Sequence, residues 1–76
     1  MCIRDRLNNE PGSLGELSNL VARNNGNIAN LNIVYRTISY FELLVDIEVK
    51  DLKHLTDIIA ALKASKVVSY VSRSTQ

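Results

Sequence analysis

Residues 9–14, Asn-Glu-Pro-Gly-Ser-Leu, combine the residue types best suited to forming a small binding site. Pro11 fixes one backbone dihedral and lacks an amide donor, while Gly12 can adopt conformations that are closed to other residues. The sequence predicts that Ser13 caps a following helix and that Glu16 completes an S-x-x-E capping box. Such a bend leaves backbone amides near a helix N-terminus, where a small anionic group such as a carboxylate can bind. The predicted chemistry is therefore binding rather than catalysis.

The other reactive side chains do not form a set that metal binding would need. His54 is the sole histidine, and Asp51 and Asp57 are its nearest acidic neighbours in the sequence. Structural zinc sites normally have four protein ligands and catalytic sites three, so we predict that His54 is a solvated helix residue. Cys2 has no histidine or second cysteine beside it and is predicted to be inert. The sequence predicts no metal and no cofactor.

A row of carboxylates on one predicted strand suggests the paired acids of a hydrolase, but we interpret it as the solvated face of a sheet. Arg36, across a predicted hairpin, is the expected partner for these acids. The chain has no Walker loop, no H-E-x-x-H motif and no nucleophile elbow, so the domain is predicted not to be an enzyme. The acids are Glu42, Asp46 and Glu48. A docking patch for another domain is predicted where Val34, Tyr40 and Leu44 interrupt this polar face.

Composition indicates one small domain in a reducing compartment. The chain has 76 residues, of which 46% are hydrophobic, so we expect an ordered fold with a thin core that a partner would stabilise. The formal net charge of +1 argues against recognition of nucleic acid by bulk electrostatics. A single cysteine precludes an intrachain disulfide, and there is no signal peptide or bilayer-spanning apolar run. We predict a cytoplasmic protein with no membrane partner.

Hydrophobic periodicity predicts five elements after the bend. Apolar residues recur with helical spacing in two segments and alternate with polar residues in three others. The helices are predicted at residues 13–24 and 52–63, and the strands at residues 27–36, 40–50 and 67–73.

Local signals define how these elements end and pair. Gly26 is predicted to take the left-handed position that ends the first helix, and Asp51 to cap the second. In the hairpin we place Ile33 opposite Leu43, which keeps both apolar sets facing the core.

A first strand within residues 2–9 would complete a βαββαβ order. Right-handed crossovers then give an α+β, ferredoxin-like fold, with a four-stranded antiparallel sheet in the order 2-3-1-4 and two helices on one face. Edge strands two and four favour pairing with a second copy, as a homodimer, or with a neighbouring domain. Asp5 conflicts with this fold because it would be a charge buried under the helices. Either the first strand starts late or frays, or residues 1–6 are not original to the domain.

The chain resembles an ACT domain, on the evidence of three features. These are the βαββαβ order, the N-x-P-G-x-L bend of residues 9–14, and the G-N-I triplet at residues 26–28. Residues 27–33, 46–55, 58–63 and 67–69 are similar to the C-terminal ACT domain of the RelA/SpoT family, which synthesises and hydrolyses the alarmone (p)ppGpp. Residues 1–6 instead resemble a translated adapter scar. We therefore place an ACT regulatory domain at residues 7–74 and treat residues 1–6 as a non-native segment.

The resemblance implies a non-catalytic regulatory module, the C-terminal fragment of a bifunctional synthetase and hydrolase. Such a module would control alarmone synthesis and hydrolysis in response to amino-acid or ribosome signals. The implied partners are a small amino acid, with branched-chain ones favoured, other domains of the parent protein and, in some members, the ribosome.

The resemblance also implies ligand contacts for Asn9 and Asn27. The alternative is that both serve turns, where asparagine is common. Some ligand-binding members have a histidine where this chain has Leu7, and that departure weakens the expectation. The full set of predicted ligand-binding residues is Asn9, Gly12, Ser13, Leu14, Asn27 and Ile28.

Two alternative functions stay open. One is an amino-acid-binding ACT domain of an amino-acid metabolic enzyme. The other is an RNA-binding ferredoxin-like module, although that fold stacks bases on aromatic residues of the sheet, where this chain is expected to present carboxylates that repel phosphate. An acylphosphatase-like activity needs an arginine in the bend, and a metallochaperone needs a C-x-x-C motif; both are absent.

Overall fold

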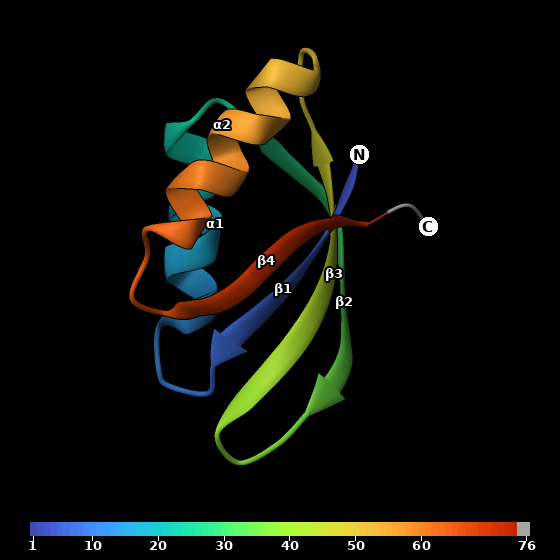
Figure 1. The fold of residues 1–76 in the computed structure, drawn as a ribbon. Coiled ribbons are helices and arrows are strands. Elements are labelled where there is room, and N and C mark those ends of the chain that lie inside the picture. The colour runs from blue at the N-terminus through green and yellow to red at the C-terminus, as the bar shows by residue number, and fades with distance from the viewer. Residues whose placement is uncertain (75–76) are drawn as a thin grey trace.

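The computed structural model describes residues 1–74 as a four-stranded antiparallel sheet with two helices packed on one face (Figure 1). The spatial order of the strands is β2-β3-β1-β4, as predicted. Along the chain the elements are β1 (Cys2–Asn8), α1 (Ser13–Arg23), β2 (Asn27–Arg36), β3 (Tyr40–Glu48), α2 (Leu52–Lys63) and β4 (Val68–Ser74).

The core lies between the sheet and the helices. β1 is a central strand and pairs with both β3 and β4, so Ile3 lies opposite Val45 and Leu7 opposite Phe41. Alternate residues of β1 and β3 are buried because successive side chains of a strand point to opposite faces. The buried apolar residues are Ile3, Leu7, Leu17, Val21, Phe41, Leu43, Val45, Ile47, Leu55, Ile58, Leu62, Val68 and Val71.

The β2–β3 hairpin has the predicted pairing of Ile33 with Leu43, but Ile33 is less buried than expected. Ile33 pairs with Leu43, and register shifts on either side of this region place Tyr35 opposite Glu42. Ile33 and Leu43 therefore share the inward face of the sheet, as predicted, but Leu43 is fully buried whereas Ile33 is 44% exposed in the single chain. β2 is an edge strand, and the two helices leave its inward face partly uncovered.

The bend before α1 forms, but Ser13 does not cap the helix. Gly12 occupies the N-cap position with a left-handed φ of 87°, and no side chain caps this end. Its carbonyl accepts the first helical bond from the amide of Glu16 at 2.9 Å. Ser13 is instead the first helical residue and is fully buried, so the predicted S-x-x-E capping box is absent.

The end of α1 also differs from prediction in one residue. Asn25, with φ 64°, takes the left-handed position that we assigned to Gly26. The amides of Asn25 and Gly26 donate to the carbonyls of Ala22 and Val21 at 3.0 and 2.9 Å, which is a Schellman motif. Gly26 is required for space instead, since an added Cβ would lie 2.8 Å from Cδ1 of Ile58.

The second helix starts as predicted. Asp51 is its N-cap, and its carboxylate accepts a hydrogen bond from the amide of His54 at 2.8 Å.

Asp5 is fully buried at the centre of β1. The strand begins at Cys2, so it neither starts late nor frays as one interpretation predicted. The foreign origin of residues 1–6 stays a prediction.

Candidate functional site

The bend at residues 9–12 is held against the turn between β2 and β3. The backbone amide of Asn9 donates to the carbonyl of Ser39 at 2.9 Å. Its side-chain amide donates to the carbonyls of Thr37 and Ile38, at 3.2 Å in each case. The predicted turn role of Asn9 is therefore real in this structure, and its side-chain oxygen is the atom left for a ligand to contact.

The start of α1 carries the other predicted bend residues. Gly12 and Leu14 are exposed, while the hydroxyl of Ser13 is fully buried and has no hydrogen-bond partner among the described residues. The backbone amide of Ser13 donates to the carbonyl of Glu10 at 3.2 Å, so the amides that follow it in the first turn of α1 are the ones left for a ligand.

Asn27 and Ile28 lie at the opposite end of the molecule from the bend. Asn27 pairs with Glu48 at the far end of the hairpin and donates a side-chain hydrogen bond to its carboxylate at 2.7 Å. Ile28 is half-buried opposite Ile47. At about 3.3 Å per residue, the length of β2 separates Asn27 from the turn that Asn9 contacts by roughly 30 Å. One chain therefore does not bring the two halves of the predicted ligand site together.

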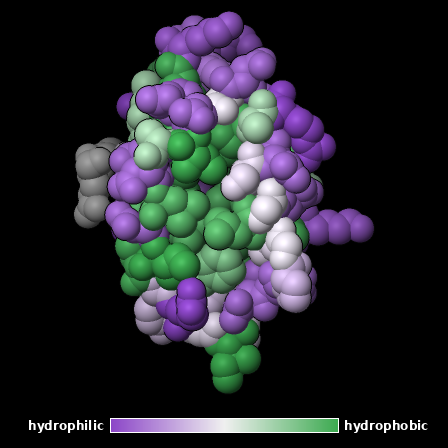
Figure 2. Space-filling model, turned by 180° about the vertical axis from the view of Figure 1, so that it is seen from behind, coloured by the Kyte–Doolittle hydropathy of each residue, from purple (hydrophilic) through white to green (hydrophobic). Residues whose placement is uncertain are grey.

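A strip of apolar surface runs along β2 between these two ends. We call it the β2 strip; Ile28, Leu31 and Ile33 form it, and their cross-strand partners on β3 are all buried. Seen from behind, the molecule shows hydrophobic surface that extends from its centre to the lower left, with hydrophilic surface above it and to its right (Figure 2). The free edge of β2 lies on this side of the sheet, which ends at β2.

Two hollows lie along α1, and none of the bend residues 9–12 lines either of them. One of about 490 Å³ opens between α1 and the end of α2, over Leu20 and Val67. A second lies on the exposed side of α1, and the two share Glu16 and Arg23, whose side chains pair at 3.5 Å. Because both are wide open, neither is an enclosed ligand cavity.

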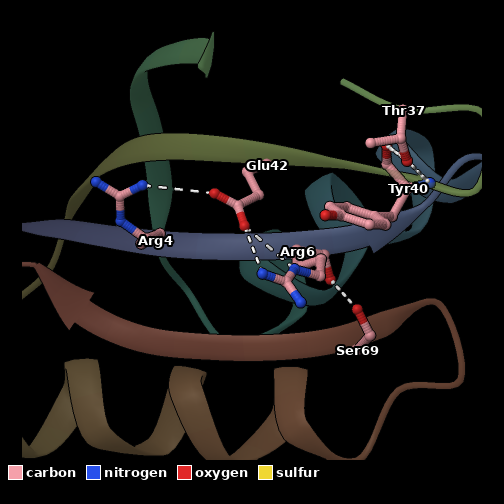
Figure 3. A network of polar contacts seen from close by, with 6 residues as sticks. All are labelled: Arg4, Arg6, Thr37, Tyr40, Glu42 and Ser69. Atoms are coloured by element: carbon pink, nitrogen blue, oxygen red, sulfur yellow. Dashed lines mark hydrogen bonds and ion pairs between the residues drawn. The ribbon is translucent and has the colours of Figure 1, made fainter. Parts of the chain in front are cut away.

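The outer face of the sheet carries a polar network that the sequence reading only partly anticipated (Figure 3). Glu42 of β3 pairs with Arg6 at 2.7 Å and with Arg4 at 3.6 Å, both on β1. The prediction that Arg36 is the partner was wrong, because the central strand β1 brings its own arginines beside Glu42. One carboxylate thus lies within ion-pair distance of both arginines of β1.

Aromatic residues share this face. The guanidinium of Arg6 lies 4.6 Å from the ring centroid of Tyr40, and the rings of Tyr35 and Tyr40 are 6.2 Å apart. The predicted docking patch therefore has Tyr35 and Arg6 as members that sequence reasoning missed. The signal that could have found them is the sheet order, which sets β1 and β2 on either side of β3.

His54 was predicted to be a solvated helix residue, but its ring forms hydrogen bonds with two loops. Its Nδ1 accepts a hydrogen bond from the amide of Lys50 at 3.0 Å, so Nε2 carries the proton and donates to the carbonyl of Asn24. Both ring nitrogens are thereby used in joining the end of α1 to the start of α2. Within residues 1–74, no three His, Cys, Asp or Glu side chains come together as a metal site would need.

Cys2 is half-buried, and this burial raises the pKa of its thiol, with the nearby Asp46 carboxylate acting in the same direction. A raised thiol pKa means less of the reactive thiolate. Neither of the helices in the described residues is long enough to cross a bilayer.

The fold and the bend together define a regulatory domain of the ACT type. The family model for the ACT domain matches residues 3–73, and the chain belongs to that family. It is homologous to a segment of GTP pyrophosphokinases of the RelA/SpoT type. It is 46% identical over 65 residues to the GTP pyrophosphokinase rsh of Brucella ovis, a match that covers 86% of this chain and 9% of that protein. The match to the Brucella melitensis protein of the same name has the same identity and coverage.

Solved structures show the same fold. The ACT domain from the GTP pyrophosphokinase of Chlorobium tepidum has a TM-score of 0.79 at 20% identity, covering 96% of this chain and 94% of that one. A homoserine dehydrogenase from Thiobacillus denitrificans has a TM-score of 0.70 at 22% identity, over 95% of this chain and 16% of that one. The chain spans about a tenth of the length of its curated relatives (9%) and is a regulatory, non-catalytic domain by family.

Proposed function

We propose that this ACT domain senses a small amino acid at a site built by two copies of the chain. The observation that carries the proposal is the separation of Asn9 from Asn27, which one chain holds at opposite ends of β2. An isologous pair joins the same surface of both subunits. If two β2 edges meet antiparallel, the Asn27 end of one strand lies beside the turn that Asn9 contacts in the other.

The surface of β2 suits such a pair. An edge strand presents unpaired amides and carbonyls that can form hydrogen bonds with a second strand. The β2 strip would be buried at the same time, including Ile33, which is 44% exposed in the single chain. Apolar burial and strand pairing would then both favour association.

The chemistry of the two ends favours an amino acid with an apolar side chain. The first amides of α1 suit a carboxylate, because helix N-termini favour anions. The oxygen of Asn9 suits an ammonium group, and the β2 strip suits a branched aliphatic side chain. Leucine, isoleucine and valine have all three groups.

Calorimetric titration with these three amino acids tests the ligand. We expect heat of binding at millimolar concentration or below, and a loss of about tenfold in affinity on Asn9→Ala or Asn27→Ala. Asn19→Ala, on the exposed side of α1, is the matched control and should bind as the parent chain does. Absence of heat with folded protein would defeat the ligand proposal.

The wider role follows from the relatives. We propose that the domain belongs to a longer cytoplasmic protein that makes or hydrolyses (p)ppGpp, and that it regulates those activities by docking on other domains or on the ribosome. The 46% identity to GTP pyrophosphokinase rsh supports this role. Co-sedimentation of the full-length protein with ribosomes, compared with the protein lacking this domain, tests it. Equal co-sedimentation of both would remove the ribosome from the proposal.

A further inference from the structure

We infer that this chain binds a proton at Asp5 when it folds, so that the stability of the folded domain falls as pH rises towards neutrality. Asp5 lies on the face of β1 that the helices cover, and it is 0% exposed. Neither of its carboxyl oxygens has a hydrogen-bond partner among the described residues. An ionised carboxylate at this position would have lost its hydration without gaining a bond.

The neighbours of Asp5 in the sheet are apolar. Leu43 of β3 and Val71 of β4 lie beside it in the sheet, and Ile3 and Leu7 flank it along β1. The helices cover this face with their own buried residues, which apart from Ser13 are apolar. Those residues are Leu17 and Val21 of α1 and Leu55, Ile58 and Leu62 of α2.

The charged groups of the neighbouring elements are directed elsewhere or are paired. By alternation, Arg73 of β4 shares the face of Val71, but it is exposed and lies opposite Ile3. The charged residues of β3 alternate with its buried residues and lie on the outer face. The charged groups of the helices form two ion pairs, Glu16 with Arg23 and Lys53 with Asp57. His54 makes a hydrogen bond through each ring nitrogen, and Lys63 is exposed.

Proton binding makes the buried position tolerable. At a pH between the unfolded and the folded pKa of Asp5, folding takes up one proton from solvent and converts the Asp5 carboxylate into a carboxylic acid. Consistent with this, burial raises the pKa of Asp5 from 3.8 to about 7. Between these two values the folded state binds more protons than the unfolded state, so stability falls as pH rises. Below 3.8 both states are protonated, and above about 7 both are ionised and the loss of stability is complete.

Titration of the intact chain tests the proposal directly. The side-chain carboxyl carbon of Asp5, followed by NMR, should titrate with a midpoint near 7 in the folded chain. A midpoint below 5 for Asp5 would overturn the proposal. This measurement needs no variant to fold.

Equilibrium unfolding supplies a second test. Urea unfolding would be compared at pH 4.5 and 7.5 for the parent chain, Asp5→Asn and the control Asp46→Asn. Over this range the unfolding constant of the parent chain should rise about a hundredfold relative to that of Asp5→Asn, which cannot ionise. Asp46→Asn should follow the parent chain. Parallel profiles for the parent chain and Asp5→Asn would overturn the proposal.

Discussion

At the scale of single residues, His54 shows how one side chain can join two distant loops. Its ring accepts from the amide of Lys50 and donates to the carbonyl of Asn24. We expect His54→Ala to lower the free energy of unfolding by about 1–3 kcal/mol, since both backbone partners lose a bond. Chemical denaturation followed by circular dichroism measures the change. Lys53→Ala, which removes only an exposed pair with Asp57, is the control and should change stability by less than about 0.5 kcal/mol.

Replacing the buried Asp5 with an apolar residue should change the stability of the chain. Asp5→Leu replaces an unpartnered buried carboxyl with an apolar side chain, so it should stabilise the chain by about 3 kcal/mol at pH 7.5. The folded pKa of Asp5 is raised, so its ionisation penalises the fold only as pH rises above 3.8. The gain should therefore shrink at pH 4.5. Thermal unfolding at the two pH values measures it, and a gain independent of pH would contradict the ionisation account.

The roles of some single residues could be predicted from the sequence, and the roles of others could not. Asp51 was recognised as a cap because its type and position suffice for that role. Ser13 was assigned a cap and is buried instead, because Gly12 turns the chain one residue earlier. The bonds of His54 reach Asn24, which is far away in the sequence, and no local pattern encodes such a contact.

At the scale of elements, the connection from α1 to β2 depends on a glycine that leaves space. A Cβ on Gly26 would lie 2.8 Å from Ile58 Cδ1 and 3.0 Å from Val21 Cγ1. We expect Gly26→Ala to destabilise the chain by about 1–3 kcal/mol, because core side chains must shift. Gly15→Ala is the control: it lies within α1 with nothing inside 4 Å, so it should stabilise the helix by up to about 1 kcal/mol. Urea denaturation of both variants measures the difference, and equal effects would refute the packing role of Gly26.

The elements themselves were predictable because their periodicities are strong. Both helices and all four strands lie within one or two residues of their expected bounds, and the sheet order follows from right-handed crossovers. The exposure of Ile33 was not predictable from alternation alone. Alternation states which face of a strand is apolar, but only the position of the helices decides whether an edge strand is covered.

At the scale of the whole molecule, the two groups of predicted ligand-binding residues are separated in the single chain. The bend residues and the Asn27-Ile28 pair were both identified from the sequence, yet the hairpin holds them at opposite ends of β2. A sequence motif does not indicate whether the two halves of a ligand site come from one chain or from two copies of it. The β2 strip, which is only partly covered in the single chain, is the structural reason to expect a second copy.

Mixing two defective chains tests this arrangement. In a pair joined along β2, each site uses Asn9 of one chain and Asn27 of the other, so homodimers of Asn9→Ala or of Asn27→Ala have no intact site. A mixed dimer has one intact site and one that lacks both amides. Refolding the two variants together should therefore restore parent-like affinity for leucine at about a quarter of all sites, which calorimetry reads as stoichiometry.

The matched control is the Asn9→Ala chain refolded with the double variant Asn9→Ala, Asn27→Ala. No dimer in that mixture has Asn9, so no recovery is expected, although association along β2 is unchanged. If sedimentation shows that the chains are dimers and neither mixture recovers leucine affinity, the two asparagines do not share one site. The role of Asn9 would then be its hydrogen bonds to Thr37 and Ile38 in the turn.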